Sequence, residues 1–187
     1  MRASASALKE CGHDAVVLSL DRPDDPWVPG FPCELLALGK TGRKYGFSPG
    51  LIAALRGRRA DAFFVHGLWL YHGLATRWSG ARPYLVYPHG MMDPWFRSAY
   101  PAKHQKKLLY WRLAERGLVN GADAVVFTSA DERDRARGVF PGYAPRMEKV
   151  IPLGIAPPPG DPARRQHHQP ANRKECFSLA GAKLGAE

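Results

Sequence analysis

The feature that most constrains the fold is a regular alternation of short apolar runs with longer stretches of helical pattern. The short runs are rich in apolar and β-branched residues, as buried strands are. They are Asp14–Leu20, Asp61–Val65, Tyr84–Tyr87, Ala122–Thr128 and Lys149–Leu153, with a further candidate at Cys33–Leu38. Helical patterns occupy residues 2–11, 50–59, 68–78, 102–119 and 130–139. This alternation predicts an α/β fold, a mostly parallel sheet with helices on both faces.

The stretch around the third of these runs carries the clearest chemical signal. Tyr84–Tyr87 predicts a buried strand, and Pro88 ends it because proline has no N–H for the ladder. His89 and Gly90 therefore follow at the carboxyl edge of the sheet, where open α/β sheets bind ligands. A histidine there can hydrogen-bond a phosphate or a sugar hydroxyl, and a glycine lets a ligand approach the backbone. The alternative is that His89 only satisfies a loop carbonyl.

Two further patterns resemble known motifs, but their surroundings argue against both. Residues 39–41 (Gly-Lys-Thr) match the end of a phosphate-binding loop, yet Glu34 stands where that loop needs a glycine. Residues 46–50 match the Gly-x-Ser-x-Gly nucleophile elbow, which needs a buried strand before it, and the preceding residues are polar. Ser48 followed by Pro49 instead predicts the N-cap and first turn of a helix.

Several segments together resemble a known family in order and spacing. They are Val65–Trp69, Pro88–Trp95, Lys103–Trp111, Ala122–Ser129 with Glu132 and Arg133, and Val150–Gly154. Over roughly residues 5–157 the chain is similar to the N-terminal, acceptor-side domain of bacterial family 4 glycosyltransferases of the GT-B architecture. The resemblance implies a Rossmann-like domain. It also implies transfer of a sugar from a nucleotide-diphosphate donor to a glycan or lipid-linked acceptor in cell-envelope polysaccharide biosynthesis. Such transfer usually retains the anomeric configuration and uses no cofactor or catalytic metal.

The same resemblance assigns roles to individual residues. His89 is implied as the catalytic residue, facing the transferred sugar and the donor phosphates. The implied substrate-binding residues are His66, Gly67, Gly90, Asp93, Trp95, Ser129 and Glu132. For Ser129 and Glu132 the alternative is a capped helix with an acidic first turn, which needs no ligand. The family binds its donor in a C-terminal domain, for which this sequence shows no counterpart.

Domain organisation is predicted from the two ends of the chain. A Rossmann-like domain begins with a strand and a glycine-rich turn, whereas this chain begins inside the first helix. We therefore expect a truncated N-terminal domain over residues 1–157 that lacks its first strand. Residues 158–187 are polar and proline-containing, without strong periodicity, and predict a disordered linker or tail.

A formal net charge of +10 would attract nucleic acid, anionic lipid or a diphosphate-containing substrate, although a bias of composition toward arginine also accounts for part of it. The basic residues of the helix predicted at 102–119 include Lys103, Lys106, Lys107 and Arg112. They fit an ordinary amphipathic helix with a solvated basic face, and the alternative is a helix that rests on anionic lipid and brings the enzyme to a lipid-linked acceptor. A second hypothesis is therefore a non-catalytic half-domain that binds an anionic membrane or another anionic partner. Nucleic acid ranks lower because the aromatics look buried, and a chain without present function remains a third possibility.

Cysteine and histidine spacing predicts no metal site. Cys11, Cys33 and Cys176 are widely separated and form no Cys-x-x-Cys pair, which favours reduced thiols in a cytoplasm. His66 and His72 are six residues apart and face different sides of a helix. No apolar run approaches the roughly 18 residues that cross a bilayer. The expected location is the cytoplasm, with possible peripheral contact at the inner membrane.

Overall fold

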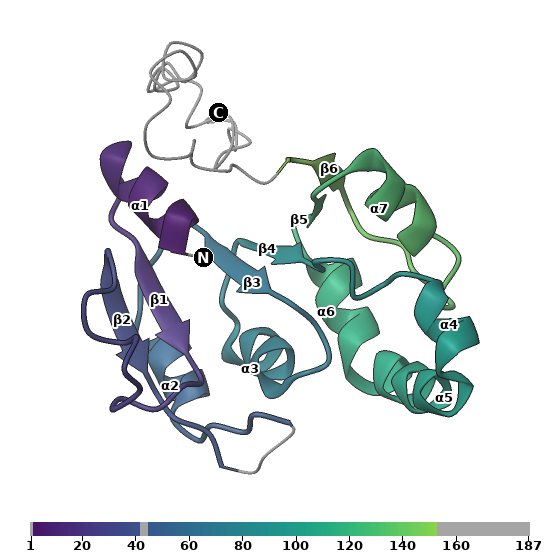
Figure 1. The fold of residues 1–187 in the computed structure, drawn as a ribbon, viewed down its shortest axis with the longest axis horizontal. Coiled ribbons are helices and arrows are strands. Elements are labelled where there is room, and N and C mark those ends of the chain that lie inside the picture. The colour runs from purple at the N-terminus through teal and green to yellow at the C-terminus, as the bar shows by residue number, and fades with distance from the viewer. Residues whose placement is uncertain (1, 42–44, 153–187) are drawn as a thin grey trace.

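The strands form two parallel sheets in the computed structural model, which describes residues 2–41 and 45–152 (Figure 1). The first sheet pairs β1 (Val16–Ser19) with β2 (Glu34–Ala37). The second has the order β3 (Phe63–His66), β4 (Tyr84–Tyr87), β5 (Ala124–Phe127) and β6 (Glu148–Val150). Every pairing is parallel. The expected α/β fold with parallel strands is confirmed. The sequence predicted one sheet, whereas the structure divides the strands between two.

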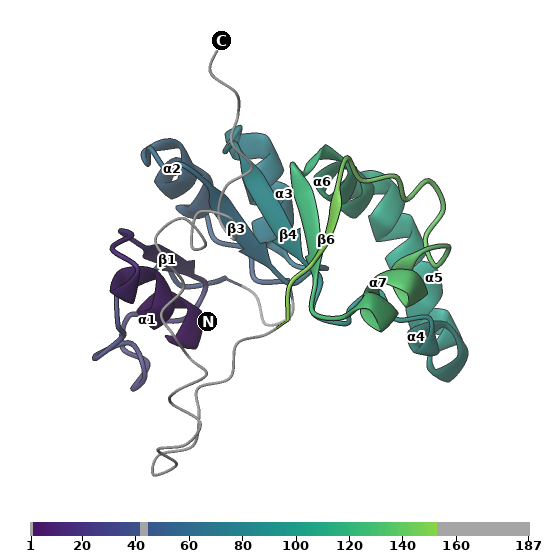
Figure 2. The same ribbon diagram turned by 90° about the horizontal axis from the view of Figure 1, so that it is seen from above.

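One helix precedes β1, a loop at 20–33 without a helix joins β1 to β2, and all later connections between successive strands contain helices. The helices are α1 (Arg2–Glu10), α2 (Leu51–Arg56), α3 (Tyr71–Ser79), α4 (Trp95–Ala99), α5 (Pro101–Tyr110), the π-helix η1 (Trp111–Glu115), α6 (Arg116–Gly121) and α7 (Ala130–Ala136). Figures 1 and 2 show α3 and α6 side by side along the four-stranded sheet. None of the helices in the described ranges is long and apolar enough to span a membrane.

The main core lies between the four-stranded sheet and the helices that follow it. Val86 and Val125 are completely buried on neighbouring strands, and Trp111 and Leu118 pack against them from η1 and α6. All four residues of β5 are buried, which is typical of a strand inside a parallel sheet. A smaller cluster joins α2 and α3 to Leu18 of β1, so the two sheets share apolar packing.

The predicted basic helix is present, but it contains one turn of π-helix. α5, η1 and α6 follow one another without a break from Pro101 to Gly121. In η1 the side chains of Trp111, Ala114 and Glu115 are all buried. A π-turn widens the helix by one residue per turn. The two neighbours Ala114 and Glu115 consequently both face the interior.

Three local expectations are wrong. Ser48 is not a helix cap, because Gly50 occupies the N-cap position of α2. Among the described residues, no side chain caps α2 and the buried Ser48 hydroxyl has no hydrogen-bond partner. The short helix α4 was not expected, because the sequence from Pro94 through Trp95 and Phe96 lacks the apolar periodicity of a helix. Cys33 carries a free thiol as predicted, whereas Cys11 is disulfide-bonded. The predicted tail at 158–187 lies outside the described residues.

Candidate functional site

The loop after β4 is a tight turn with an unusual backbone. The Met91 N–H donates to the Pro88 carbonyl oxygen over 3.1 Å, and both central residues have positive φ, 51° at His89 and 73° at Gly90. Two positive φ values are the signature of a type I′ turn, in which glycine, asparagine and aspartate predominate. Histidine is tolerated in this region but is uncommon there. The turn therefore holds an exposed histidine in a conformation that its sequence context alone does not favour.

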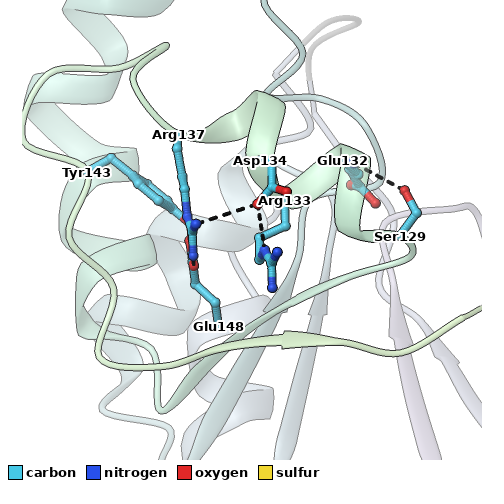
Figure 3. Close-up of polar contacts among 7 residues, drawn as sticks. All are labelled: Ser129, Glu132, Arg133, Asp134, Arg137, Tyr143 and Glu148. Atoms are coloured by element: carbon cyan, nitrogen blue, oxygen red, sulfur yellow. Dashed lines mark hydrogen bonds and ion pairs between the residues drawn. The ribbon is translucent and has the colours of Figure 1, made fainter.

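Glu132 at the start of α7 fixes this turn. Its Oε1 atom accepts the Gly90 N–H over 2.7 Å, and its Oε2 atom accepts both the N–H and the hydroxyl of Thr128, over 2.7 and 2.6 Å. Ser129 is the N-cap of α7 and accepts the Glu132 N–H over 3.1 Å, as Figure 3 shows. The predicted cap is confirmed. Both Glu132 oxygens are engaged, so in this structure the carboxylate positions the His89 turn.

The loop after β3 lies beside the same turn. Gly67 and Trp69 both have positive φ, 85° and 69°. The Trp69 N–H donates to the buried Glu115 carboxylate over 2.7 Å, and its indole N–H donates to the Met91 carbonyl over 3.3 Å. His72 Nε2 lies 3.1 Å from the Gly67 carbonyl oxygen, to which it donates. The two loops at the carboxyl edges of β3 and β4 are thus tied together and to η1.

His66 and His89 form a direct hydrogen bond across these loops. His66 Nδ1 lies 2.9 Å from His89 Nε2, and the ring planes differ by 14°. Tyr87, the parallel-ladder partner of His66, stacks on the His66 ring with centroids 4.8 Å apart. His66 is half-buried, whereas His89 is exposed. The predicted edge of the sheet therefore presents an ordered imidazole pair.

The electrostatic setting keeps the histidines of this region neutral near pH 7. Burial, reinforced by the neighbouring His89, lowers the pKa of His66 to about 4. Burial also lowers the pKa of His72, and it lowers that of His89, where the nearby Glu132 carboxylate opposes the shift. A neutral imidazole has one donor and one acceptor nitrogen. The pair is suited to hydrogen-bonding a sugar hydroxyl in this state, and a protonated His89 would support phosphate charge.

Asp93 and Trp95 lie on the chain segment just beyond the turn. Asp93 Oδ1 accepts the Trp95 N–H over 2.7 Å, and Asp93 Oδ2 lies 3.7 Å from the Arg135 guanidinium on α7. The Trp95 side chain is 56% exposed and meets Phe96 and Tyr100 edge-on. Asp93 thus anchors this segment to α7. The Trp95 ring is open to solvent, and within the described ranges its aromatic neighbours are Phe96 and Tyr100.

The four basic residues predicted to bind anions fall into two groups. Lys106 and Arg112 are exposed. Lys103 is exposed as well, with its ammonium 4.3 Å from the centre of the Tyr100 ring. The Lys107 ammonium instead lies 4.8 Å from the Trp69 ring and 4.4 Å from the Phe96 ring, and burial lowers its pKa. Lys107 therefore helps to pack α5 against the site.

A separate polar network joins α7 to β6. The Glu148 carboxylate accepts the Tyr143 hydroxyl over 2.7 Å and pairs with the Arg137 guanidinium, and Figure 3 shows Asp134 beside Arg137. Tyr143 and Arg137 also line a shallow hollow. These groups are mutually paired, so the network stabilises the fold. No group of three or more metal-ligating side chains occurs among residues 2–41 and 45–152.

Sequence reasoning missed three contributors to the site: Tyr87, His72 and Glu115. Tyr87 carried no sequence signal for this role, because its alignment with His66 comes from the β3–β4 register. His72 was considered only as a metal ligand. Glu115 carried no signal, since a glutamate in a basic helix is ordinarily solvated.

One of three comparisons with known proteins found a match. The family model for the glycosyl transferase 4-like domain matches residues 1–154, which contain both histidine loops and the α7 clamp. Neither a curated protein nor a solved structure matches the chain. The match spans most of the sequence, and so the chain belongs to the glycosyl transferase 4-like domain family and has the general function of a glycosyltransferase domain, which binds a sugar donor and an acceptor.

Proposed function

We propose that this chain is the acceptor-side domain of a bacterial GT-B glycosyltransferase. It moves a sugar from a nucleotide-diphosphate donor to a glycan or lipid-linked acceptor in cell-envelope polysaccharide biosynthesis, with retention of configuration. The observation that supports this most is the His66–His89 pair at the carboxyl edges of β3 and β4, inside the family match. Open α/β sheets bind ligands at that edge.

Sugar transfer requires groups that hold the sugar in place while the diphosphate leaves and an acceptor hydroxyl attacks. His89 is exposed at the site and hydrogen-bonds the transferred sugar or the donor phosphates. At Gly90 a Cβ would meet nothing within 4 Å, so the backbone there is open to a close ligand. Trp95 offers an apolar face for an acceptor sugar ring, and Asp93 holds that segment to α7. The proposal includes no cofactor and no metal, by resemblance to the family.

The donor diphosphate is bound, on this proposal, by a second Rossmann-like domain. Residues 1–157 form the acceptor domain, and residues 158–187 belong to the linker. The chain is then one half of a two-domain enzyme and transfers sugar only together with the other half. Reading the encoding DNA on both sides in all frames tests this organisation. A second domain with a Glu-x7-Glu pattern downstream supports it, and its absence contradicts it.

The transfer itself is tested on the restored two-domain protein. The protein is incubated with labelled nucleotide sugars and membrane-extracted acceptors, and the label transferred to the acceptor is measured. We expect His89→Ala to reduce transfer by about 100-fold or more, the usual cost of losing a group that stabilises the transition state. Arg137→Ala, in the paired network of α7 and β6, serves as a control and should retain transfer. A His89→Ala enzyme with near-normal turnover would contradict the proposed role.

A second candidate function, binding to an anionic membrane, is favoured by one surface of the basic helix. Leu109 and Leu113 are 62% and 69% exposed, one helical turn apart, and Lys106 and Arg112 are exposed beside them. Exposed leucines flanked by cations are typical of helices that rest on anionic lipid. This second proposal is that the domain binds peripherally at the cytoplasmic side of the inner membrane, either to meet a lipid-linked acceptor or as a binding module without catalysis.

Co-sedimentation of the full chain with vesicles tests this candidate. We expect binding to vesicles rich in anionic phosphatidylglycerol, weaker binding to phosphatidylcholine, and loss of binding as salt rises. Lys106→Glu with Arg112→Glu should abolish it, and Leu109→Ser with Leu113→Ser should weaken it. Lys9→Glu with Arg59→Glu, at two exposed positions outside the basic helix, is the charge-matched control. Binding that is equal on both lipids, or equal for all variants, would reject the membrane surface.

A further inference from the structure

We propose that His66 is a positioning residue for His89, whose Nε2–H donates to His66 Nδ1 and whose ring plane and tautomer are thereby fixed. The proposal rests on the proposed function, in which His89 contacts the sugar, and it gives His66 a role other than binding the acceptor. It also names the ring atom that meets the ligand, His89 Nδ1.

The hydrogen bond between His66 and His89 lies close to the plane of both imidazole rings. The two bonded nitrogens are 2.9 Å apart, and the ring planes differ by only 14°. The ring centroids are 5.2 Å apart, much farther than the bonded nitrogens. The nitrogens of His66 and His89 therefore point at one another, and the rings do not lie face to face. Rotation of the His89 ring about χ2 breaks this bond, so the bond selects one orientation.

His66 is held firmly enough to act as the fixed partner. It ends β3 in register with Tyr87 of β4, and the Tyr87 ring stacks on it at 24°. The Gly67 carbonyl that follows is held by His72 from α3. These contacts fix the backbone and the ring of His66 before any ligand arrives.

His89 is held by its backbone but has few side-chain contacts of its own. The turn is anchored at Gly90 by Glu132, and the His89 side chain is exposed. Within the described part of the chain, His66 is the hydrogen-bond partner of the His89 ring. The Nδ1 atom of His89 remains available. Without His66 the ring would turn freely and exchange tautomers, as an exposed histidine does.

The direction of the bond follows from the surroundings of the two rings. Among residues 2–41 and 45–152, the titratable groups that face the pair are Tyr87 from β4, His72 from α3 and Glu132 from α7. Glu132 lies nearer His89 and favours a proton there, whereas the more buried His66 resists one, with a pKa of about 4. His66 Nδ1 thus remains the acceptor whether His89 is neutral or charged. Neutral His89 then offers the Nδ1 lone pair to a sugar hydroxyl, and charged His89 offers Nδ1–H to a phosphate.

Imidazole nitrogen shifts of the ligand-free full chain test this assignment directly, because a protonated nitrogen and a lone-pair nitrogen resonate far apart. The spectra are long-range proton–nitrogen correlations recorded at about pH 8, where unperturbed histidine is neutral. Single histidine substitutions assign the signals. We expect His66 and His89 each to show one tautomer, protonated at Nε2. A His89 that averages between tautomers, or is protonated at Nδ1, overturns the proposal without the need for any variant.

Two matched variants separate positioning from simple packing. His66→Asn places an amide oxygen where Nδ1 was, so His89 should keep its single tautomer. His66→Gln carries the same amide one carbon farther out, so His89 should become an averaged, exposed imidazole. An unchanged His89 tautomer in a folded His66→Gln protein also overturns the proposal. In the two-domain enzyme, His66→Gln should lower turnover about 10- to 100-fold, as loss of an orienting partner does, and His66→Asn should restore most of it.

The two proposals fail in different ways. The tautomer measurement needs no sugar, so it stands or falls without any transfer activity. Absence of sugar-nucleotide transfer with His89 in a single tautomer would contradict the proposed function alone. Normal transfer by the His66→Gln enzyme would contradict the positioning role alone.

Discussion

The buried carboxylate of Glu115 accepts the backbone N–H of Trp69 over 2.7 Å, although Trp69 is 46 residues away in the chain. The bond joins η1 to the loop after β3 and holds Trp69 at its positive φ. The second oxygen of Glu115 is buried and has no hydrogen-bond partner in the described structure. The π-turn in the basic helix thereby supports the loop that follows His66. It does so through a buried carboxylate, and burying a carboxylate costs free energy.

This acid predicts an unusual pH dependence of stability. Burial raises the pKa of Glu115 to about 7, while the Trp69 hydrogen bond opposes the shift. Between pH 4.5 and 7 the folded state holds the proton more tightly than the unfolded state, so stability falls as pH rises through this window. Glu115→Gln keeps the acceptor for Trp69 and removes the charge. We expect the free energy of unfolding of the variant to exceed that of the wild type by about 3 kcal/mol at pH 8 and to equal it near pH 4.5.

Urea unfolding of both proteins across this range measures the difference. The histidines with lowered pKa titrate in both proteins alike, so their contribution cancels. Glu10→Gln on the exposed face of α1 is the control and should show no such trend. A Glu115→Gln stability difference that is constant with pH would contradict the buried-acid account.

The Glu132 clamp predicts a local loss of order around His89. Glu132→Ala removes the acceptor for the Gly90 N–H and for two groups of Thr128, all of them half-buried, and each lost hydrogen bond costs about 0.5–1.5 kcal/mol. Hydrogen exchange of the Gly90 and Thr128 amides should accelerate more than that of the β5 core. Asp131→Ala, an exposed neighbour on the same helix, should change stability by less than about 0.5 kcal/mol. Unchanged protection of the Gly90 amide in Glu132→Ala would argue against the clamp.

The backbone of the His89 turn predicts a contrast between two glycines. A Cβ at Gly90 or at Gly50 would meet nothing within 4 Å, but φ is +73° at Gly90 and −76° at Gly50. Gly90→Ala should therefore destabilise the fold by about 1 kcal/mol through backbone strain alone. Gly50→Ala should be neutral or slightly stabilising. Thermal unfolding compares the two variants, and equal effects would mean that the positive φ at Gly90 carries no strain.

Much of the architecture is predictable from sequence because β1, β3, β4 and β5 lie in compact runs rich in β-branched or aromatic residues. The run Ala122–Thr128 contains β5, and Ser129 caps α7 as its position suggests. The π-turn is not predictable in this way, since Trp111–Glu115 has the composition of an ordinary α-helix. α4 escapes prediction because none of its side chains is buried.

The candidate site is predictable in its location but not in its contacts. His66 and His89 each follow an apolar run, and the carboxyl ends of parallel strands meet at one edge of a sheet. Their hydrogen bond depends on the β3–β4 register, which aligns His66 with Tyr87 and which no local pattern specifies. Glu132 is predictable as a first-turn acid, whereas its reach to Gly90 comes from tertiary packing.

The central claim is that the His66–His89 edge binds a glycosyltransferase substrate. The most direct measurement is a titration of the nitrogen-15-labelled full chain with nucleotide sugars and with oligosaccharide acceptors, followed by amide and imidazole shifts. The account predicts progressive shifts at His66, Gly67, His89 and Gly90, while Tyr143 and Glu148 stay unmoved. Shifts confined to the Tyr143–Glu148 hollow, or none at the histidine loops with any ligand, would contradict it.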